Sequence, residues 1–249
     1  MKKSLLLVMC LVVVVLVTSQ TYAAAYFTED FSGGAMPANM QSNFASGASF
    51  DNQNHISFVN GTAQWDAVQN RQYLSTIASD YSSVNFCLDA TMTTTGATAW
   101  GGIFIGMGDG NADSGNWGEP TNPKIVITIQ PTGWFGDIYG RDNSEVMALG
   151  LEGAIGDGTH RVRMNWDAST QTAVFQIDAY YAGGDFAADY TTGVFHGIDN
   201  GFTSSNSHLF IGGGENMVVD NISVMVPEPA TMLLLGLGGM VIARKKRIC

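Results

Sequence analysis

The sequence predicts an all-β protein whose strands form an antiparallel sandwich or barrel. Apolar and polar residues alternate with a period of two in several segments, which is the pattern of half-buried strands. Pairs of turn-forming residues separate these segments, and between the two chain ends no segment has the 3.6-residue period of an amphipathic helix. About a dozen short strands at such spacing are typical of sandwiches and barrels.

The strands are expected in segments that run through most of the chain. The clearest alternation lies at 84–92, 124–130, 161–166 and 172–178, and shorter apolar or aromatic runs lie at 26–31, 56–59, 62–65, 103–107, 134–139, 208–211 and 218–225. Turns are expected at Asn60-Gly61, Asp109-Gly110, Asp157-Gly158, Gly183-Gly184 and Asn200-Gly201, because these residue pairs adopt the left-handed backbone of tight turns. Trp65, Trp100 and Trp166 lie in alternating segments and are expected in the core.

The first 25 residues have the composition of a secretory signal peptide. Lys2 and Lys3 precede an apolar run at 5–17, and the stretch 21–25 ends in Ala23-Ala24-Ala25, an A-x-A-like cleavage site. We therefore expect residues 1–25 to form a signal helix and residues 26–225 to be an exported β-sandwich body.

The last 24 residues, 226–249, form a separate segment. The motif Pro227-Glu228-Pro229 precedes an apolar run at 230–243, and a basic cluster follows at Arg244, Lys245, Lys246 and Arg247. The run is short for a bilayer span, which needs about 20 apolar residues. Because basic flanks stay cytoplasmic, the expected short transmembrane helix would hold the body on the outer side of the membrane.

This order of Pro-Glu-Pro motif, apolar run and basic terminus resembles the PEP-CTERM sorting signal of bacteria that make exopolysaccharide. The resemblance implies that an exosortase, a membrane protease, recognises Pro227-Glu228-Pro229 and removes the tail. It implies a precursor anchored in the inner membrane, and then a protein at the cell surface or in the extracellular matrix.

The body is strongly acidic once the two ends are set aside. Between Tyr26 and Glu228, 22 Asp and Glu residues face five basic residues, which leaves a formal net charge of −17. Nucleic acids and anionic membranes are recognised by basic surfaces, so neither is an expected partner of the body. A single cysteine, Cys87, remains in the body, so no internal disulfide is expected, and its place in a strand predicts burial.

The stretch of residues 157–178 narrows the choice of sandwich fold. Asp157-Gly158 opens a strand that ends in Trp166-Asp167, and Ala168-Ser169-Thr170 turns it into the next strand. This pair resembles the paired strands of concanavalin A-like and laminin-G-like domains, and the segments 28–32 and 219–224 resemble their first and last strands. The resemblance implies a lectin- or glucanase-like jelly-roll sandwich, with an immunoglobulin-like sandwich as the alternative.

The body lacks the usual signs of an enzyme. Hydrolases of this fold usually carry paired carboxylates on one strand, where side chains two residues apart share a face. The six glutamates are isolated from one another, and no Gly-x-Ser-x-Gly or His-Glu-x-x-His motif is present. We therefore predict a non-catalytic protein, with a polysaccharide hydrolase or lyase of unfamiliar site as the alternative.

Two groups of residues are candidate ligands for a structural Ca²⁺ ion. Asp109, Asn111 and Asp113 place oxygen atoms at alternate positions, as the opening of a calcium loop does, and a polar hairpin loop of turn-forming residues is the alternative. The resemblance to jelly-roll modules implies a second group, in which Glu29 and Asp30 meet Asp220 if the first and last strands pair.

Candidate carbohydrate contacts are aromatic residues beside polar or turn-forming ones. Trp117 lies in a polar segment rich in Gly and Pro, and Trp134 and Tyr139 flank Asp137. Aromatic rings stack on sugar rings while neighbouring polar groups fix their orientation. The sequence thus predicts an exported surface or exopolysaccharide-associated protein that contacts polysaccharide, with a purely structural matrix protein as the alternative.

Overall fold

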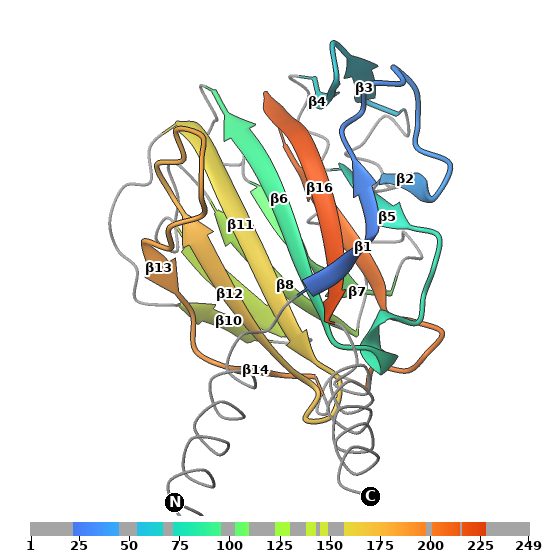
Figure 1. The fold of residues 1–249 in the computed structure, drawn as a ribbon, viewed down its shortest axis with the longest axis vertical. Coiled ribbons are helices and arrows are strands. Elements are labelled where there is room, and N and C mark those ends of the chain that lie inside the picture. Colours follow the sequence, from blue (N-terminus) through green and yellow to red (C-terminus); the bar gives the residue numbers. More distant parts are fainter. Residues whose placement is uncertain are drawn as a thin grey trace, which may run out of the picture. The chain divides into compact units, whose positions relative to one another are not determined.

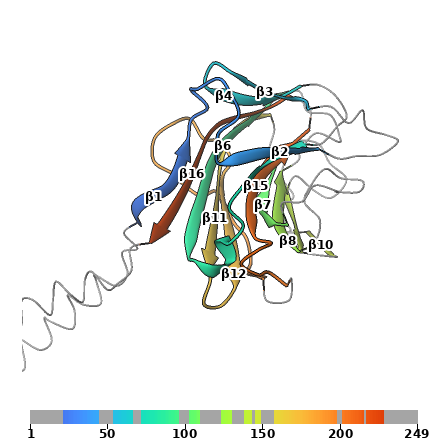
Figure 2. The same cartoon turned by 90° about the vertical axis from the view of Figure 1, so that its right-hand side faces the viewer.

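The computed structural model describes residues 22–44, 54–66, 72–95, 103–109, 123–129, 138–142, 145–148, 157–197, 201–214 and 216–227. Residues Phe27–Val224 form one compact unit, and the two chain ends fall in another. The described strands of the body form two antiparallel sheets (Figure 1). Figure 2 shows these sheets nearly edge-on, facing each other as two layers.

The first sheet, sheet A, has the central order β13-β12-β11-β6-β16-β4-β3, while β1 also pairs with β16 and β14 with β12. Its strands are β1 (Tyr22–Glu29), β3 (Ile56–Val59), β4 (Thr62–Trp65), β6 (Phe86–Thr94), β11 (Gly158–Asp167), β12 (Thr172–Asp178), β13 (Tyr190–Thr191), β14 (Phe195–His196) and β16 (Met217–Pro227).

The second sheet, sheet B, has the order β10-β9-β8-β7-β15-β5-β2. Its strands are β2 (Met40–Phe44), β5 (Gln72–Thr76), β7 (Ile103–Gly108), β8 (Lys124–Ile129), β9 (Ile138–Asp142), β10 (Glu145–Ala148) and β15 (His208–Gly213). A single turn of 3₁₀ helix, η1 (Tyr81–Ser83), follows β5.

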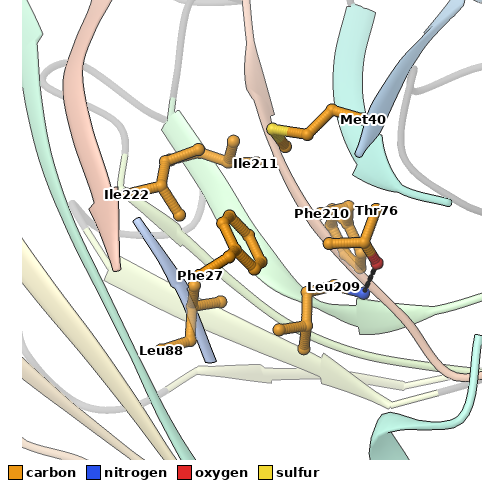
Figure 3. Close-up of a pocket in the computed structure, with 8 residues that line it drawn as sticks. All are labelled: Phe27, Met40, Thr76, Leu88, Leu209, Phe210, Ile211 and Ile222. Carbon is orange, nitrogen blue, oxygen red and sulfur yellow. Dashed lines mark hydrogen bonds between the residues drawn. The ribbon is translucent and has the colours of Figure 1, made fainter. Parts of the chain in front are cut away.

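The core lies between the two sheets. In β11, Val162, Met164 and Trp166 are buried. Arg161 and Arg163, which alternate with them along the strand, are partly exposed on the other face. An apolar pocket marks where the inner faces meet (Figure 3). Its lining comes from both sheets and includes Phe27, Leu88 and Ile222 of sheet A and Met40, Thr76, Leu209 and Ile211 of sheet B.

The predicted all-β sandwich is confirmed, and several strands fall where the alternation placed them. Strands β3, β4 and β12 match the expected segments, and β11 and β12 form the expected hairpin. Asn60 and Gly61 have φ angles of 53° and 76°, as a tight turn with two left-handed residues requires. Trp65, Trp166 and Cys87 are buried as predicted, whereas Trp100 lies outside the described residues.

The β11–β12 turn shows how the sequence closes a hairpin. Asp167 Oδ1 accepts hydrogen bonds from Ser169 Oγ at 2.7 Å and from Ser169 N at 2.8 Å. These bonds, the one from the Ser169 side chain first, lower the pKa of Asp167, because they stabilise its ionised form. Gln171 then adopts a left-handed backbone with φ 51°, and β12 begins.

The expected signal helix and short transmembrane helix both fall outside the described residues. In the part of the chain that the structure does describe, no helix is long and apolar enough to cross a membrane. The domain limits at residues 25 and 225 therefore stay predictions.

Candidate functional site

The face of sheet B that points away from sheet A carries a cluster of aromatic residues. Successive side chains in a strand point to opposite faces, so the residues between the core-facing ones form this outer face. Tyr73 of β5, Phe104 of β7, Val126 of β8 and Phe210 of β15 form one buried cluster there. The rings of Tyr73 and Phe210 meet edge-on with centroids 5.8 Å apart.

Gly212 allows two of these aromatic residues to approach. The register pairs it with Tyr73 on one side and Phe104 on the other. A Cβ atom on Gly212 would lie 2.5 Å from Phe104 Cε2 and 2.5 Å from Tyr73 Cβ. The absence of a side chain at this position therefore lets both residues pack over the centre of sheet B.

Polar side chains border the cluster on the β2 side. Ser75 Oγ accepts hydrogen bonds from Asn43 Nδ2 at 2.7 Å and from Gln41 Nε2 at 3.3 Å. The register places Asn43 beside Tyr73 and Gln41 beside Ser75. The outer face of sheet B thus combines aromatic rings with amide and hydroxyl groups.

The Tyr73 hydroxyl is a polar atom without a hydrogen-bond partner in the described part of the chain. Tyr73 is fully buried, and burial raises the pKa of its phenol, with a further contribution from the negative charge of Asp109. An unpaired buried hydroxyl destabilises the fold by about 1–3 kcal/mol, so such atoms are usually paired with water or a ligand. This hydroxyl is therefore a candidate contact for a polar ligand.

Tyr139, predicted as a carbohydrate contact, falls in the same cross-strand row as the cluster. Its backbone pairs with Thr128 of β8, and Thr128 pairs with Phe104 of β7. Trp134 and Asp137 belong to the connection that leads from β8 into β9, and both lie outside the described residues.

The opposite end of β8 carries the other predicted group. Asp109 directly follows β7, and its backbone N–H donates to the carbonyl oxygen of Pro123 at 3.0 Å, just before β8. Asn111, Asp113 and Trp117 belong to the connection 110–122 between these two residues and lie outside the described residues. The candidate cation ligands and Trp117 therefore share one connection with its two ends tied together.

The predicted carbohydrate contacts thus divide into two groups. The β7–β8 connection enters β8 at Lys124, whereas the β8–β9 connection leaves it after Ile129. A strand of this length spans about 17–20 Å. Trp117 therefore belongs to one end of β8, and Trp134 with Asp137 belongs to the other.

The second candidate cation site depends on the pairing of the first and last strands. This pairing is present, because β1 pairs with β16. Glu29 Oε1 accepts a hydrogen bond from Phe31 N at 2.7 Å, and Asp30 Oδ1 accepts one from Ser32 N at 3.0 Å. Hydrogen bonds from Ser32 lower the pKa of Asp30, and Asp220 is exposed in β16.

Glu29 and Asp30 thus each have one carboxylate oxygen hydrogen-bonded to the backbone N–H two residues further along the chain. Among the described residues, no group of three or more His, Cys, Asp or Glu side chains is arranged to hold a metal ion. A calcium site at Glu29, Asp30 and Asp220 stays a prediction.

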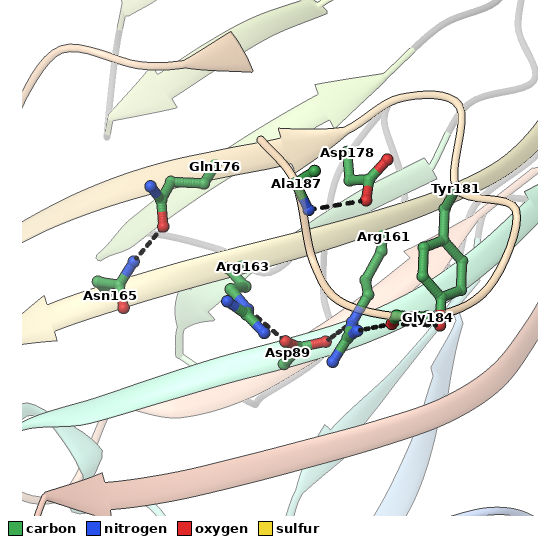
Figure 4. A network of polar contacts seen from close by, with 9 residues as sticks. All are labelled: Asp89, Arg161, Arg163, Asn165, Gln176, Asp178, Tyr181, Gly184 and Ala187. Carbon is green, nitrogen blue, oxygen red and sulfur yellow. Dashed lines mark hydrogen bonds and ion pairs between the residues drawn. The ribbon is translucent and has the colours of Figure 1, made fainter. Parts of the chain in front are cut away.

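A polar network that the sequence did not predict lies on the outer face of sheet A (Figure 4). Asp89 of β6 is 2% exposed and accepts hydrogen bonds from two arginines of β11. Arg161 Nε donates to Asp89 Oδ1 at 2.7 Å, and Arg163 Nε donates to Asp89 Oδ2. The hydrogen bond with Asp89 also raises the pKa of Arg161.

The same arginines hold the segment 179–189 against sheet A. The guanidinium carbon of Arg163 lies 3.9 Å from the centroid of the Phe186 ring, and Arg161 Nη1 donates to the carbonyl oxygen of Gly184 at 3.4 Å. Ala187 N donates to Asp178 Oδ2 at 3.1 Å. The carboxylates of Asp89 and Asp178 thus both accept hydrogen bonds, and this network connects sheet A to the segment 179–189.

Residues 226–247 match the PEP-CTERM protein-sorting motif. No curated protein sequence matches the chain. Many solved structures share its fold, which is a two-sheet antiparallel sandwich also found in lectins. The winged bean acidic lectin complexed with methyl-α-D-galactose has 14% sequence identity and a TM-score of 0.54, with 81% of this chain and 97% of the lectin covered.

Two further structures are similar. Peanut lectin has 11% identity and a TM-score of 0.54, with 82% of this chain and 97% of the lectin covered. A structure reported with endo-acting O-glycanases of the human gut microbiota has 13% identity and a TM-score of 0.52, with 82% and 99% covered. At these identities the similarity shows the fold. The chain therefore has a lectin-type sandwich body and a PEP-CTERM sorting motif at its C-terminus.

The packing at Gly212 gives a first test. Gly212→Ala is expected to lower the free energy of unfolding by about 1–3 kcal/mol, because a methyl group must displace Phe104 and Tyr73. Gly193→Ala is the control, since a Cβ at Gly193 meets no atom within 4 Å. Urea unfolding of the two variants measures the difference, and equal stabilities would contradict the packing described here.

The Asp89 network gives a second test. Arg163→Met is expected to lower the free energy of unfolding by about 1.5–3 kcal/mol, because Asp89 is buried and loses one of its two charged donors. In an Asp89→Asn background the same substitution should have a smaller effect, since the buried charge is gone. Chemical denaturation of the four proteins in this cycle gives the coupling, and additive effects would show that the pair is not coupled.

Proposed function

We propose that this chain is an exported, non-catalytic surface protein whose lectin-type body contacts carbohydrate. Its tail would first anchor the precursor in the inner membrane, where an exosortase-type protease would act at Pro227-Glu228-Pro229. The body would then remain at the cell surface or in the extracellular matrix. The observation that carries this proposal is the PEP-CTERM motif joined to a concanavalin A-like sandwich.

The carbohydrate site is proposed at the β7–β8–β9 side of sheet B. Two observations support this place, and a third supports carbohydrate as the ligand. Tyr139 shares a cross-strand row with Phe104 and Tyr73. Trp117 belongs to the connection whose ends are tied by Asp109 and Pro123. The winged bean lectin, which has the same fold, is complexed with a galactoside.

A calcium ion is proposed to order the β7–β8 connection. Asp109, Asn111 and Asp113 supply the oxygen ligands that Ca²⁺ prefers, and Trp117 follows them in the same connection. An ion held by these residues would fix the position of Trp117, so that sugar binding and calcium binding would depend on each other. Trp134, Asp137 and Tyr139 would contact the sugar from the β9 side.

The site makes a direct prediction for binding. The purified body, residues 26–225, is expected to bind at least one member of a polysaccharide panel in calcium and to lose binding in chelator. Trp117→Ala should weaken binding up to about tenfold, since stacking of an aromatic ring contributes about 0.5–1.5 kcal/mol beyond its buried area. Isothermal calorimetry with the bound polysaccharide measures the loss.

Tyr180→Ala is the matched control, because Tyr180 is 67% exposed and lies beyond β12 in sheet A. It should bind like the unchanged body. Retained binding in Trp117→Ala would remove Trp117 from the site. If no polysaccharide binds while the body is folded, the purely structural matrix protein becomes the better description.

One observation favours a hydrolase as the second candidate. The register places Asp142 of β9 directly opposite Glu145 of β10. Both residues are acidic, as are the two carboxylic residues of glycoside hydrolases. Two acidic residues at the end of a hairpin also occur without a catalytic role, and under the proposed non-catalytic function this pair has none.

The two roles differ in a simple assay. We expect no reducing ends to be released when the body is incubated with the polysaccharides of the panel. Release that is abolished in Glu145→Gln, but not in Glu29→Gln, would establish the hydrolase and overturn the non-catalytic role. Glu29 serves as the control because it lies in β1 of sheet A, with its Oε1 bonded to Phe31 N.

A further inference from the structure

One histidine of the body is buried with one ring nitrogen unpaired. His160 of β11 is 1% exposed and lies on the core face of sheet A, as Val162 does. Its Nδ1 lies 2.7 Å from the carbonyl oxygen of Ala179. A carbonyl oxygen only accepts hydrogen bonds, so Nδ1 carries the proton and Nε2 is left as an acceptor. In the described part of the chain, Nε2 has no hydrogen-bond partner.

The neighbours of His160 on β6 suit a neutral ring. The register places Met92 directly opposite it, and Thr94 two positions further along the same face. Thr94 is 2% exposed, and its Oγ1 is another buried atom that has no partner among the described residues. One hydroxyl group does not replace the water around a positive charge, so this part of the core would not accommodate a protonated ring well.

The charged residues near His160 do not overcome this effect of burial. Burial has the largest influence and lowers the pKa of His160, whereas the bond to Ala179 and the negative charge of Asp157 act in the opposite direction. Asp157 is exposed and directly precedes β11. The next charged residues on β11 and β12, Arg161 and Asp178, pair with each other and belong to the outer face of sheet A.

His160 also holds one end of the segment 179–189. Ala179, the first residue of this segment, accepts the bond from His160 at its carbonyl oxygen, and its N–H donates to Asp189 Oδ2 at 2.9 Å. Asp189 N in turn donates to the carbonyl oxygen of Ile177 at 2.8 Å. The two ends of the segment are therefore joined at Ala179. A charged His160 that left the core for water would break its bond to Ala179 and loosen both ends.

We propose that His160 is an acid-sensitive anchor, which holds the segment 179–189 on sheet A while its ring is neutral and releases the segment when its ring is protonated. An exposed histidine takes up a proton near pH 6.5. Below about this pH the open state binds a proton that the closed state does not, so its population rises up to about tenfold per pH unit. Release would separate Phe186 from Arg163, whose guanidinium carbon lies 3.9 Å from the ring centroid. The anchor needs neither the carbohydrate site nor the sorting tail.

The test measures hydrogen–deuterium exchange of the full chain, kept in solution by a non-ionic detergent, at about pH 7.5 and about pH 5.5. Both values lie above the range in which carboxylates usually take up protons, so the comparison isolates histidine. After correction for the intrinsic exchange rate, protection of the Ala187 and Asp189 amides should fall up to about tenfold at the lower pH. The Ile105 amide, in β7 of sheet B, should keep its protection. Equal protection of the segment at the two pH values would overturn the proposal.

Two variants assign the response to one histidine. His160→Gln keeps a donor for the Ala179 carbonyl oxygen but does not titrate, so its segment should be equally protected at both pH values. His208→Gln is the matched control, because His208 Nδ1 also lies 2.7 Å from a backbone carbonyl oxygen, that of Thr76, but its ring is half-buried in sheet B. This control should lose protection in acid as the unchanged chain does.

If His160→Gln does not fold, His160→Leu takes its place, since leucine is apolar like the core residues beside it and does not titrate. The protection ratio between the two pH values is the readout, so a segment that is weaker at both values still gives an answer. A fall in protection that persists in the folded His160 variant would show that another group senses the acid, and the proposal would be wrong.

Discussion

The structure depends on one constraint, which is that two sheets must bury one face each against the other. In β11 this alternation places Val162, Met164 and Trp166 in the core and leaves Arg161 and Arg163 on the outer face. A shift of one residue in register would reverse both sets, so burial of the apolar face fixes the register of the central strands. This register also determines which residues each sheet presents on its outer face.

The two outer faces carry different chemistry. On sheet A, the buried carboxylate of Asp89 is bonded by two arginines, which also hold the segment 179–189. On sheet B, the outer face carries aromatic rings, amides and the Tyr73 hydroxyl, which has no partner among the described residues. Sheet A therefore uses its charged residues for stability, whereas sheet B carries the groups beside which we propose the carbohydrate site.

The charge of the body limits what such a face can bind. The chain between Tyr26 and Glu228 carries 22 acidic and five basic residues, and two of the basic ones, Arg161 and Arg163, are bonded to Asp89. Repulsion disfavours acidic polysaccharides on so negative a surface unless a cation bridges them. For the proposed glycan ligand, this charge favours a neutral glycan, or an acidic one bound through a cation.

The sequence was sufficient for the fold class and for the half-buried strands. Strands β3, β4 and β12 were predictable because their residues alternate between core and solvent. Strand β5 was not, because all five of its residues are buried and three of them, Gln72, Ser75 and Thr76, are polar. Hydrogen bonds from distant segments satisfy these groups, as His55 N does for Gln72 Oε1, and spacing along the chain cannot reveal them.

Contacts between segments far apart in the sequence also limited how much of the candidate site could be predicted. Tyr139 was identifiable as an aromatic residue beside Asp137, but its row with Phe104 and Tyr73 exists only through the register of five strands. Asp89 and its arginines are more than 70 residues apart in sequence and meet only through the pairing of β6 with β11. Local motifs, such as Pro227-Glu228-Pro229, needed no such pairing and were read from the sequence directly.

The central claim is that the carbohydrate site lies at the β7–β8–β9 side of sheet B. Hydrogen–deuterium exchange of the body, with and without a bound polysaccharide, tests this place most directly. The account predicts protection within residues 109–142 and unchanged exchange in the segment 179–189 on sheet A. Protection confined to the segment 179–189, with none in 109–142, would contradict the account.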